Sequence, residues 1–241
     1  MSTGFRVFLQ RDLPPKELLG GFKELPAANI ADCMYRLSAL SSEIRLMSKP
    51  FAGSVAGPAL TVKARPGDNL MLHKALNMAT EGDVIVVSNE GDRSQSLMGE
   101  VMAVYGKFKK VAAFVFDGPI RDIDTIYNLE VPIYATGTTP GGPFKDGPGE
   151  INVPISCGNA YIEPGDIILG DTDGVIVIPR LDAAAILEAA RKFSVSDKAK
   201  LEAAYKGTSD RSWVEKSLES KGCIIIDAKY SDRSTFFCSE G

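Results

Sequence analysis

Three short apolar segments, separated by two helical ones, constrain the fold of this chain more than any other feature. Residues 84–87 are apolar without interruption, as expected of a strand that is buried on both faces. Residues 111–116 and 131–135 repeat this pattern, while residues 96–108 and 123–129 between them have helical composition. Strand, helix, strand, helix, strand at this spacing predicts right-handed crossovers and a parallel βαβαβ core, so we expect an α/β fold.

The segments around this core predict further elements. Asn29 and Asp68 each precede a helical pattern and are candidate N-caps. The sequence Gly-Asp-Thr-Asp-Gly at residues 170–174 lies between two apolar runs, which is typical of a hairpin. We therefore expect helices over residues 30–40 and 69–80, short strands within 51–64, a hairpin of strands 167–169 and 175–178, a long helix over 181–205, a short helix over 212–220 and a strand over 223–227.

Composition excludes several classes of function. The formal net charge is −4 and the pI about 5.2, so no general basic field attracts nucleic acid or an anionic membrane. No apolar run approaches the roughly 18 residues of a membrane span, and residues 1–12 show no signal-peptide pattern. The four cysteines form no Cys-x-x-Cys pair, which argues against zinc and disulfide frameworks. We expect a cytoplasmic protein without nucleic-acid or membrane partners.

Polar residues follow two of the predicted core strands. Residues 89–100 follow the first strand and residues 117–122 (Asp-Gly-Pro-Ile-Arg-Asp) follow the second. Because ligands collect beyond the carboxyl ends of parallel strands, these two segments should converge on one crevice. They would bring together a helix N-terminus, the Arg121 guanidinium and the carboxylates of Glu100 and Asp122.

This set of groups suits a 2-oxo acid. Amides at a helix N-terminus bind carboxylates, and Asp122 could anchor a divalent cation that keeps open coordination positions. Since no Cys or His cluster exists, we expect Mg²⁺ or Mn²⁺ held by oxygen. Arg121 would face the oxygen that becomes negative as an enolate forms. The competing interpretation is structural, because Arg-Asp after Asp-Gly also forms a turn with a helix cap.

The motifs together resemble a known family. Gly99-Glu100 is followed, after twenty residues, by Arg121-Asp122, which resembles the acidic-x20-Arg-Asp motif of the 4-hydroxy-4-methyl-2-oxoglutarate aldolase family. That family also contains the regulator of ribonuclease activity A. The resemblance extends over residues 30–227 and includes the segments Asp68-Asn69-Leu70-x-Leu72-His73, 147–154, Asp173-Gly174-Val175 and 210–214.

The resemblance carries specific expectations. It implies an α/β/β sandwich over residues 1–180, followed by a C-terminal helix and oligomerisation arm over 181–241, in homotrimers or homohexamers. It implies cleavage of a 4-hydroxy-2-oxo diacid to pyruvate and a second oxo acid, with oxaloacetate decarboxylation as a side activity. It places substrate binding at the backbone of Gly99, Glu100, Val101 and Met102 and at Arg121, metal binding at Asp122, and metal-bound water and proton transfer at Glu100. An acidic residue of a neighbouring subunit also takes part in some members.

Two alternatives stay open at this stage. The chain could be a non-catalytic regulator that binds a ribonuclease or another protein, although the regulator branch lacks the full metal motif that this chain keeps. The Gly- and Pro-rich loop at residues 137–149 could line the substrate site or a subunit contact, or serve as a plain crossover. His73, the single histidine, excludes multi-histidine metal sites, and we expect a packing or hydrogen-bonding role for it.

Overall fold

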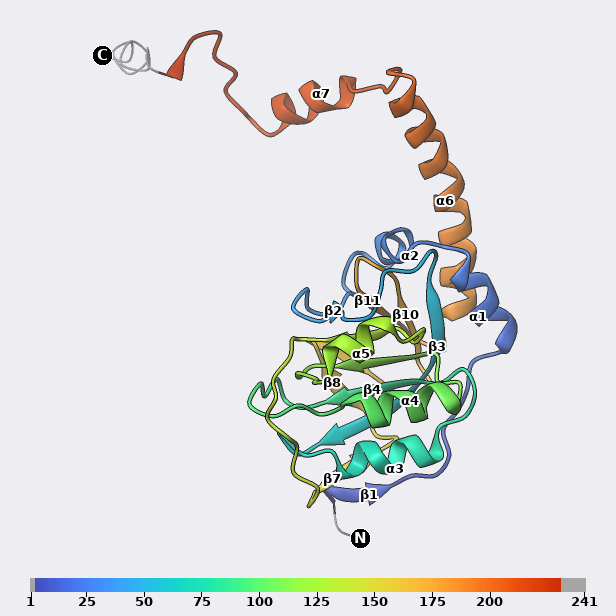
Figure 1. Cartoon of the computed structure of the whole chain (residues 1–241). Helices are drawn as coiled ribbons and strands as arrows, with labels where there is room; N and C mark the ends of the chain where they lie inside the picture. Colours follow the sequence, from blue (N-terminus) through green and yellow to red (C-terminus); the bar gives the residue numbers. More distant parts are fainter. Residues whose placement is uncertain (1–2, 231–241) are drawn as a thin grey trace. The chain divides into compact units, whose positions relative to one another are not determined.

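The computed structural model describes residues 3–230, which form two units divided between Val195 and Ser196 (Figure 1). The first unit contains the sheet and most of the helices. In chain order the strands are β1 (Phe5–Val7), β2 (Arg45–Leu46), β3 (Val55–Ala64), β4 (Val84–Ser88), β5 (Ala113–Phe116), β6 (Ile133–Ala135), β7 (Gly149–Ile151), β8 (Ile155–Cys157), β9 (Ala160–Ile162), β10 (Ile167–Gly170) and β11 (Val175–Ile178). The helices are α1 (Lys16–Lys23), α2 (Ala27–Cys33), α3 (Leu70–Met78), α4 (Glu100–Phe108), α5 (Ile123–Asn128), α6 (Ala183–Tyr205) and α7 (Ser212–Ser220).

The predicted parallel core is confirmed. Strands β3, β4, β5 and β6 are neighbours in this order and pair in parallel. Every residue of β4 and β5 is buried, because helices cover one face of the sheet and further strands cover the other. The full order β1-β7-β3-β4-β5-β6-β2 extends this core at both edges.

Strand β3 connects the central sheet to the predicted hairpin. Residues 51–64 contain this one long strand rather than several short ones. Its first residues pair with β10 of the β10–β11 hairpin, and its last residues pair with β4 and β7. Gly57 pairs with β10 just before the residues of β3 that pair with β4. A Cβ atom at this position would overlap the carbonyl oxygen of Gly82. A glycine is therefore needed for this close approach.

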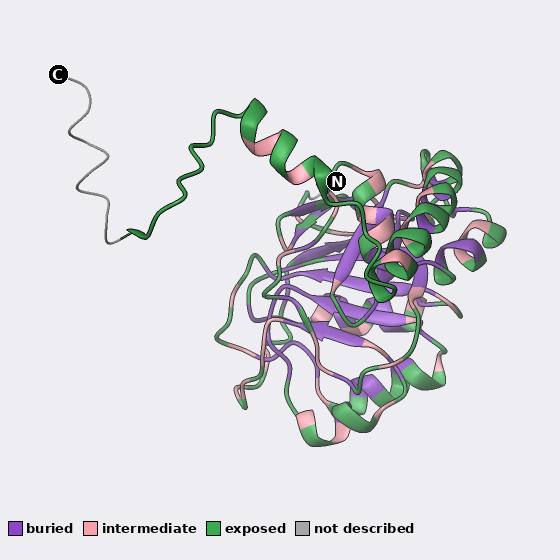
Figure 2. Ribbon diagram, turned by 90° about the horizontal axis from the view of Figure 1, so that it is seen from above, coloured by how far each residue is buried: buried purple, intermediate pink, exposed green. Residues whose placement is uncertain are grey.

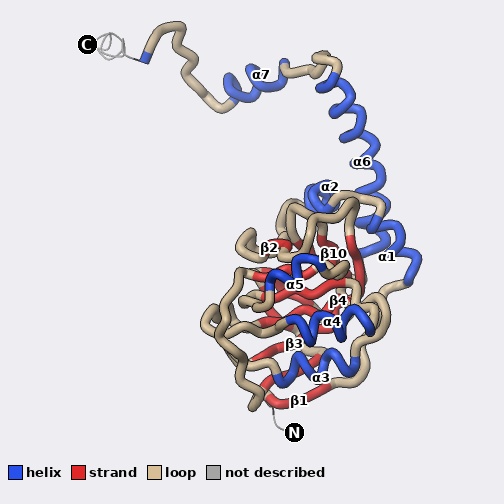
Figure 3. The backbone as a smooth tube through the Cα atoms, viewed as in Figure 1, coloured by secondary structure: helices blue, strands red, loops and turns tan. Residues whose placement is uncertain are grey.

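The layers follow from the alternation of side chains along the strands. One face of the central sheet packs its Leu, Val, Ile and Phe side chains against α3, α4 and α5, which lie together on that side (Figure 3). The opposite face packs against β8, β9 and the hairpin. Figure 2 shows the strands almost wholly buried and the helices exposed along their outer sides. The α/β/β sandwich is confirmed.

A further apolar layer covers the hairpin. Helices α1, α2 and the beginning of α6 contribute Phe22, Ile30 and Leu187, which pack against the outward-facing residues of β10 and β11. Helix α6 begins at Ala183, as the predicted C-terminal helical extension requires. Among the described helices, none is long and apolar enough to cross a membrane.

Several predicted boundaries were wrong, for local reasons. The helix expected over residues 30–40 is α2, which ends at Cys33 because Tyr35 and Arg36 adopt positive φ angles of 55° and 63°. Asn29 is inside α2 rather than its cap, since Pro26 precedes the helix. The helix expected over 96–108 begins at Glu100, because the residues before it bind neighbouring loops.

Two further corrections concern the start of α3 and the C-terminal residues. Helix α3 begins one residue after Asn69, the N-cap residue, although Asp68 still accepts a hydrogen bond from the backbone N–H of Leu70. The strand expected over residues 223–227 is not formed in the described part of the chain. The last part of the predicted oligomerisation arm, residues 231–241, lies outside the described residues.

Candidate functional site

The start of helix α4 is held by a residue that follows the neighbouring strand. Gly99, the residue before the helix, has an extended backbone, and the N–H of Glu100 donates to Asp122 Oδ2 at 2.9 Å. Glu100 and Asp122 are twenty-two positions apart, yet the parallel arrangement of β4 and β5 places the residues after each strand together. The Asp122 carboxylate thus caps α4 and satisfies one N–H that has no partner within the helix.

Backbone hydrogen bonds join three loops at this edge of the sheet. Arg121 N donates to Met98 O at 3.0 Å, and Ile120 N donates to Gly137 O at 3.0 Å. Both the amide and the hydroxyl of Ser96 donate to Gly141 O, at 2.9 and 2.6 Å. The loop at residues 137–149 is therefore part of the site rather than a plain crossover. These bonds also explain why α4 does not begin at Ser96.

Asp122 has a strained backbone. Its φ and ψ are 58° and 43°, in the left-handed region, which Asp enters more readily than most residues but at a cost of about 1 kcal/mol or more. Its Oδ2 lies 3.7 Å from Arg121 Nε, and the two side chains are 42% and 44% exposed. Strain of this kind persists where the surrounding structure requires a particular side-chain position, and here it directs the carboxylate toward Gly99 and Arg121.

Two glycines border the Arg121 side chain. A Cβ atom at Gly99 would overlap Asp122 Oδ2 and would lie 3.1 Å from Arg121 Nε. A Cβ at Gly142 would lie 3.4 Å from Arg121 Nη1. The guanidinium group therefore lies between the α4 N-terminus and the 137–149 loop, and Gly99 leaves the space that the charged pair occupies.

The site opens into a cavity of about 370 Å³. Five residues singled out from the sequence line it: Gly99, Val101, Met102, Arg121 and Asp122. Glu100 does not line it; its backbone N–H holds Asp122, while its side chain is exposed. Arg121 and Asp122 also line a neighbouring hollow of about 330 Å³ with Thr138, Thr139 and Pro140.

Three polar residues of the cavity wall were not assigned to the site from the sequence. Asn69 donates from Nδ2 to Leu97 O at 3.0 Å, while its buried Oδ1 has no hydrogen-bond partner in the described structure. His73 and Lys145 also line the cavity. Burial, and then the positive charge of Lys145, lower the pKa of His73. The i, i+4 spacing of Asn69 and His73 in a predicted helix was the available signal, since it places both on one face.

Asp68 holds the two residues that directly follow Lys145. Its buried carboxylate accepts hydrogen bonds from the amides of Asp146 at 2.7 Å and Gly147 at 2.9 Å, and from Leu70 N at 2.9 Å. One carboxylate thus joins the start of α3 to the far end of the 137–149 loop. The loop is held at both ends, which gives a long connection one defined path along the cavity.

The donor set was tested against a hard divalent cation. The described residues contain no group of three or more His, Cys, Asp or Glu side chains that could hold a metal. One oxygen of Asp122 caps α4, and the half-exposed carboxylate leaves its second oxygen accessible. Mg²⁺ is often bound through only one or two carboxylates and keeps several water ligands. The donors present fit that type of site.

The sequence and the fold were compared with known proteins. Residues 27–177 match the RraA-like family, described as Aldolase/RraA. The chain belongs to the RraA-like family. A Halalkalibacterium halodurans relative named "Putative 4-hydroxy-4-methyl-2-oxoglutarate aldolase" is 41% identical over 179 residues, which cover 74% of this chain and 84% of the relative. A Bacillus anthracis relative with the same name is 29% identical over 141 residues, 56% of this chain and 88% of its own.

A solved structure from the RraA-like family shares the fold. RraAS2 of Streptomyces coelicolor superposes with a TM-score of 0.71 at 28% sequence identity, covering 78% of this chain and 98% of its own. Its description calls it an unusual member of the RNase ES inhibitor RraA protein family. The family resemblance stated from the sequence motifs is thereby confirmed, and the family includes both aldolase and inhibitor names.

Proposed function

We propose that this protein is a divalent-metal-dependent lyase that cleaves 4-hydroxy-2-oxo diacids, such as 4-hydroxy-4-methyl-2-oxoglutarate, to pyruvate and a second oxo acid. The observation that carries the proposal is the meeting of three groups at one cavity: the α4 N-terminus, the Arg121 guanidinium and the Asp122 carboxylate. The aldolase names of two relatives support the same reaction class. Oxaloacetate decarboxylation would proceed through the same enolate.

The α4 N-terminus would bind the substrate carboxylate. The first hydrogen bond inside this turn runs from Ala103 N to Gly99 O, so the preceding amides have no acceptor within the helix. Glu100 N is already used by Asp122, which leaves the N–H groups of Val101 and Met102 for a ligand. Their positive dipole end favours an anion.

Arg121 would stabilise the charge that develops during cleavage. With Glu100 as the group that moves protons, the 4-hydroxyl would lose its proton and the C3–C4 bond would break. The electron pair of that bond would form the enolate of pyruvate, while C4 becomes a carbonyl. The enolate then takes a proton at C3. A guanidinium directed at the 2-oxo oxygen stabilises the negative charge of this transition state more than it stabilises the bound substrate, and so it accelerates the chemical step.

Asp122 would hold the metal ion, and the exposed Glu100 carboxylate would hold a water molecule on that ion and move protons. Bound there, Mg²⁺ or Mn²⁺ would polarise the 2-oxo group and orient the substrate. The remaining residues position these groups: Gly99 leaves space for the Asp122 carboxylate, and the left-handed backbone of Asp122 directs it.

We also propose that the protein acts as a homotrimer or homohexamer. Helix α4 exposes Val101, Val104, Tyr105 and Phe108 along one face, with Val101 83% and Phe108 79% exposed. Clustered exposed apolar residues of this kind mark interfaces. Light scattering would then give a mass at least three times the 25.8 kDa of one chain; a monomeric mass at micromolar concentration would contradict the proposal.

The decisive experiment is a pyruvate-release assay on a panel of 4-hydroxy-2-oxo diacids and oxaloacetate, with and without Mg²⁺ or Mn²⁺. We expect metal-dependent pyruvate release from at least one diacid. The competing function is a regulator that binds a ribonuclease, for which the description of RraAS2 is the support. A protein that releases no pyruvate with either metal but inhibits a ribonuclease in vitro would establish that alternative instead.

A further inference from the structure

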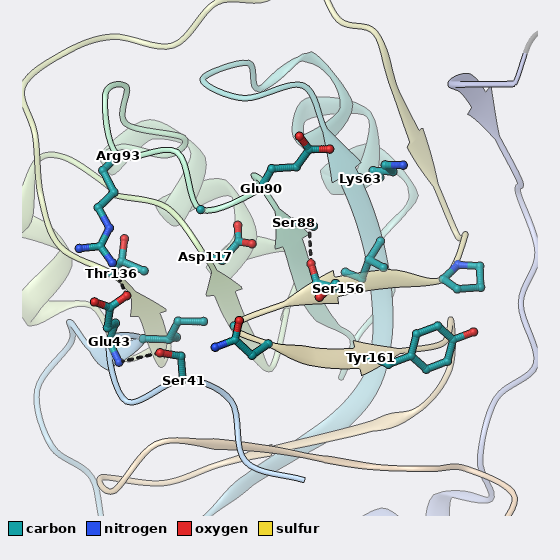
Figure 4. A pocket seen from close by; sticks show the side chains of 16 residues that line it. Ser41, Glu43, Lys63, Ser88, Glu90, Arg93, Asp117, Thr136, Ser156 and Tyr161 are labelled. Atoms are coloured by element: carbon teal, nitrogen blue, oxygen red, sulfur yellow. Dashed lines mark hydrogen bonds and ion pairs between the residues drawn. The ribbon is translucent and has the colours of Figure 1, made fainter. Parts of the chain in front are cut away.

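A second and larger cavity, of about 520 Å³, opens at the same ends of the strands but on the other face of the sheet. Its walls are the residues that follow β4, β5 and β6, the β8–β9 hairpin and the loop before β2 (Figure 4). Volumes of this order are typical of small-molecule sites. Neither Arg121 nor Asp122 lines it.

A row of polar side chains forms its floor. Lys63 of β3 pairs with Ser88 of β4, and the registers Val87–Phe116 and Val115–Tyr134 continue the row to Asp117 and Thr136. Residues two and four positions earlier on β4 and β5 face the same side, and there they belong to an apolar core. The side-chain chemistry thus changes from apolar to polar where the strands end, as it does at ligand sites of parallel sheets.

The charges in the cavity are mixed and only partly paired. Glu43 and Arg93 form an ion pair at one side. Glu90 and Asp117 both line the cavity, and no ion pair of either carboxyl group is present among the described residues. Burial raises the pKa of Asp117, and the negative charge of Glu90 adds to that rise. Lys63 lies at the β3 end of the row. An ammonium group beside the two carboxyls would remove that repulsion.

Of the two buried polar groups of the floor, one lacks a hydrogen-bond partner. The Asp117 side chain belongs to a residue only 7% exposed, and it accepts bonds from backbone amides, one of them from Asn89. The buried Thr136 hydroxyl has no hydrogen-bond partner in the described structure. Buried polar groups are normally satisfied, so an unpartnered hydroxyl next to a charged cavity points to a ligand.

We propose that this cavity binds a small zwitterion of the amino-acid type, with its ammonium group against Glu90 and Asp117 and its carboxylate toward Lys63. The Thr136 hydroxyl supplies a further hydrogen bond. A simple anion would meet two carboxyl groups, and a simple cation would meet Lys63, whereas a zwitterion complements both ends of the row. The inference is independent of the lyase activity, because it rests on different side chains and on the opposite face of the sheet.

The test is isothermal titration calorimetry of the full-length protein with each standard L-amino acid. At least one should bind with a dissociation constant below about 10 mM. For the tightest of them, the matching 2-hydroxy acid, which lacks the ammonium, and the matching amine, which lacks the carboxylate, should each bind about ten-fold more weakly or worse. Failure of every amino acid, or equal binding of either analogue, would overturn the proposal.

Variants separate this cavity from the Arg121 site. Glu90→Gln and Asp117→Asn keep side-chain size and should weaken binding about ten-fold or more, whereas Arg121→Ala, which removes no group from this cavity, should bind like the wild type. Glu90 is on a surface loop, so Glu90→Gln still decides the question if Asp117→Asn fails to fold. Unchanged affinity in Glu90→Gln, or lost affinity in Arg121→Ala, would contradict the assignment.

Discussion

The two cavities at the carboxyl ends of the parallel strands share one short segment and still differ in chemistry. Residues 117–122 border both: Asp117 lines the cavity on the β8–β9 face, while Arg121 and Asp122 line the cavity on the helical face. The Asp117 residue is 7% exposed, whereas the Asp122 side chain is 42% exposed. Two aspartates five positions apart therefore meet different surroundings.

The difference shows how burial divides the roles of identical side chains. Asp122 keeps contact with solvent, lies near a guanidinium and binds a helix N-terminus, which suits a metal ion that retains water. Asp117 has backbone amides and a nearby carboxyl instead, and burial raises its pKa to about 6. The first arrangement favours chemistry on an anion, and the second favours binding of a positive group.

The largest expected effect is the loss of lyase activity when the metal ion or its ligand Asp122 is removed, because only the Arg121 cavity is proposed to use a metal. A chelator should abolish pyruvate release reversibly, and Asp122→Asn should abolish it permanently. Asn tolerates the left-handed backbone and keeps an oxygen that can accept the Glu100 N–H, so the stability loss should stay near 1 kcal/mol or below. Amino-acid binding at the Asp117 cavity should persist in both cases. Full lyase activity in excess chelator would contradict the metal assignment.

The next effect concerns Arg121. Arg121→Ala should lower kcat by about 10²–10³-fold with a smaller change in KM, because the guanidinium acts mainly on the developing charge. Arg121→Lys keeps the charge but loses the planar fork and should recover only a small part. Aldol cleavage and decarboxylation should fall together in steady-state assays.

The competing interpretation of Arg121 predicts a different result. The backbone bond from Arg121 N to Met98 O survives either substitution, so circular dichroism and the melting temperature should stay near those of the wild type. If Arg121→Ala unfolds the protein, or raises KM with kcat intact, Arg121 is a turn residue rather than a catalytic one.

A smaller effect is expected from a single added methyl group. Gly99→Ala should displace the Asp122 carboxylate, because the new Cβ overlaps Oδ2, and should reduce kcat about 10- to 100-fold. Gly142→Ala is the matched control, since its Cβ would lie 3.4 Å from Arg121 Nη1 and needs only a slight adjustment. Equal losses in the two variants would show that the space at Gly99 does not position Asp122.

A further effect is on stability rather than on activity, and it belongs to the other cavity. Burial raises the Asp117 pKa from its usual 3.8 to about 6, so the folded protein binds more protons than the unfolded chain between these values. Stability should therefore fall as pH rises through this range, by at most about 3 kcal/mol, and the loss is complete above the folded pKa. Urea unfolding of wild type and Asp117→Asn from about pH 4 to pH 7 measures the difference.

The comparison of wild type with Asp117→Asn separates the contribution of Asp117 to the pH dependence from the contributions of other titratable groups. Glu90 and Cys157 face it from the loop after β4 and from β8, and both remain in the variant. Asp166, whose pKa burial also raises, contributes equally to both proteins. Parallel stability curves for the two proteins would show that Asp117 is already charged at low pH.

The prediction from sequence succeeded where local pattern and chain order are sufficient. The apolar run at residues 84–87 is the pattern expected of a strand buried on both faces, and its alternation with helices predicts a parallel sheet. That geometry alone brings Gly99 and Arg121 together, as the structure shows. The hairpin at residues 167–178 followed from its turn residues in the same way.

The elements that the sequence did not predict depend on partners far along the chain. Strand β1 is defined by its parallel pairing with β7, more than 140 residues later, and neither segment has a clear pattern of its own. Residues 223–227 have three consecutive isoleucines but no strand to pair with in the described structure. Apolar composition gives a tendency, and a strand needs a neighbour to satisfy its backbone.

The sequence by itself determined the α/β class, the parallel core and the residues that follow each strand, because periodicity and connection length are local properties. Only the tertiary structure decided which of those residues share a face. The row from Lys63 to Thr136 exists because the three registers that join β3, β4, β5 and β6 align, and a shift of a strand by one residue would turn its side chains to the opposite face. The second cavity was therefore visible only once the strands were paired.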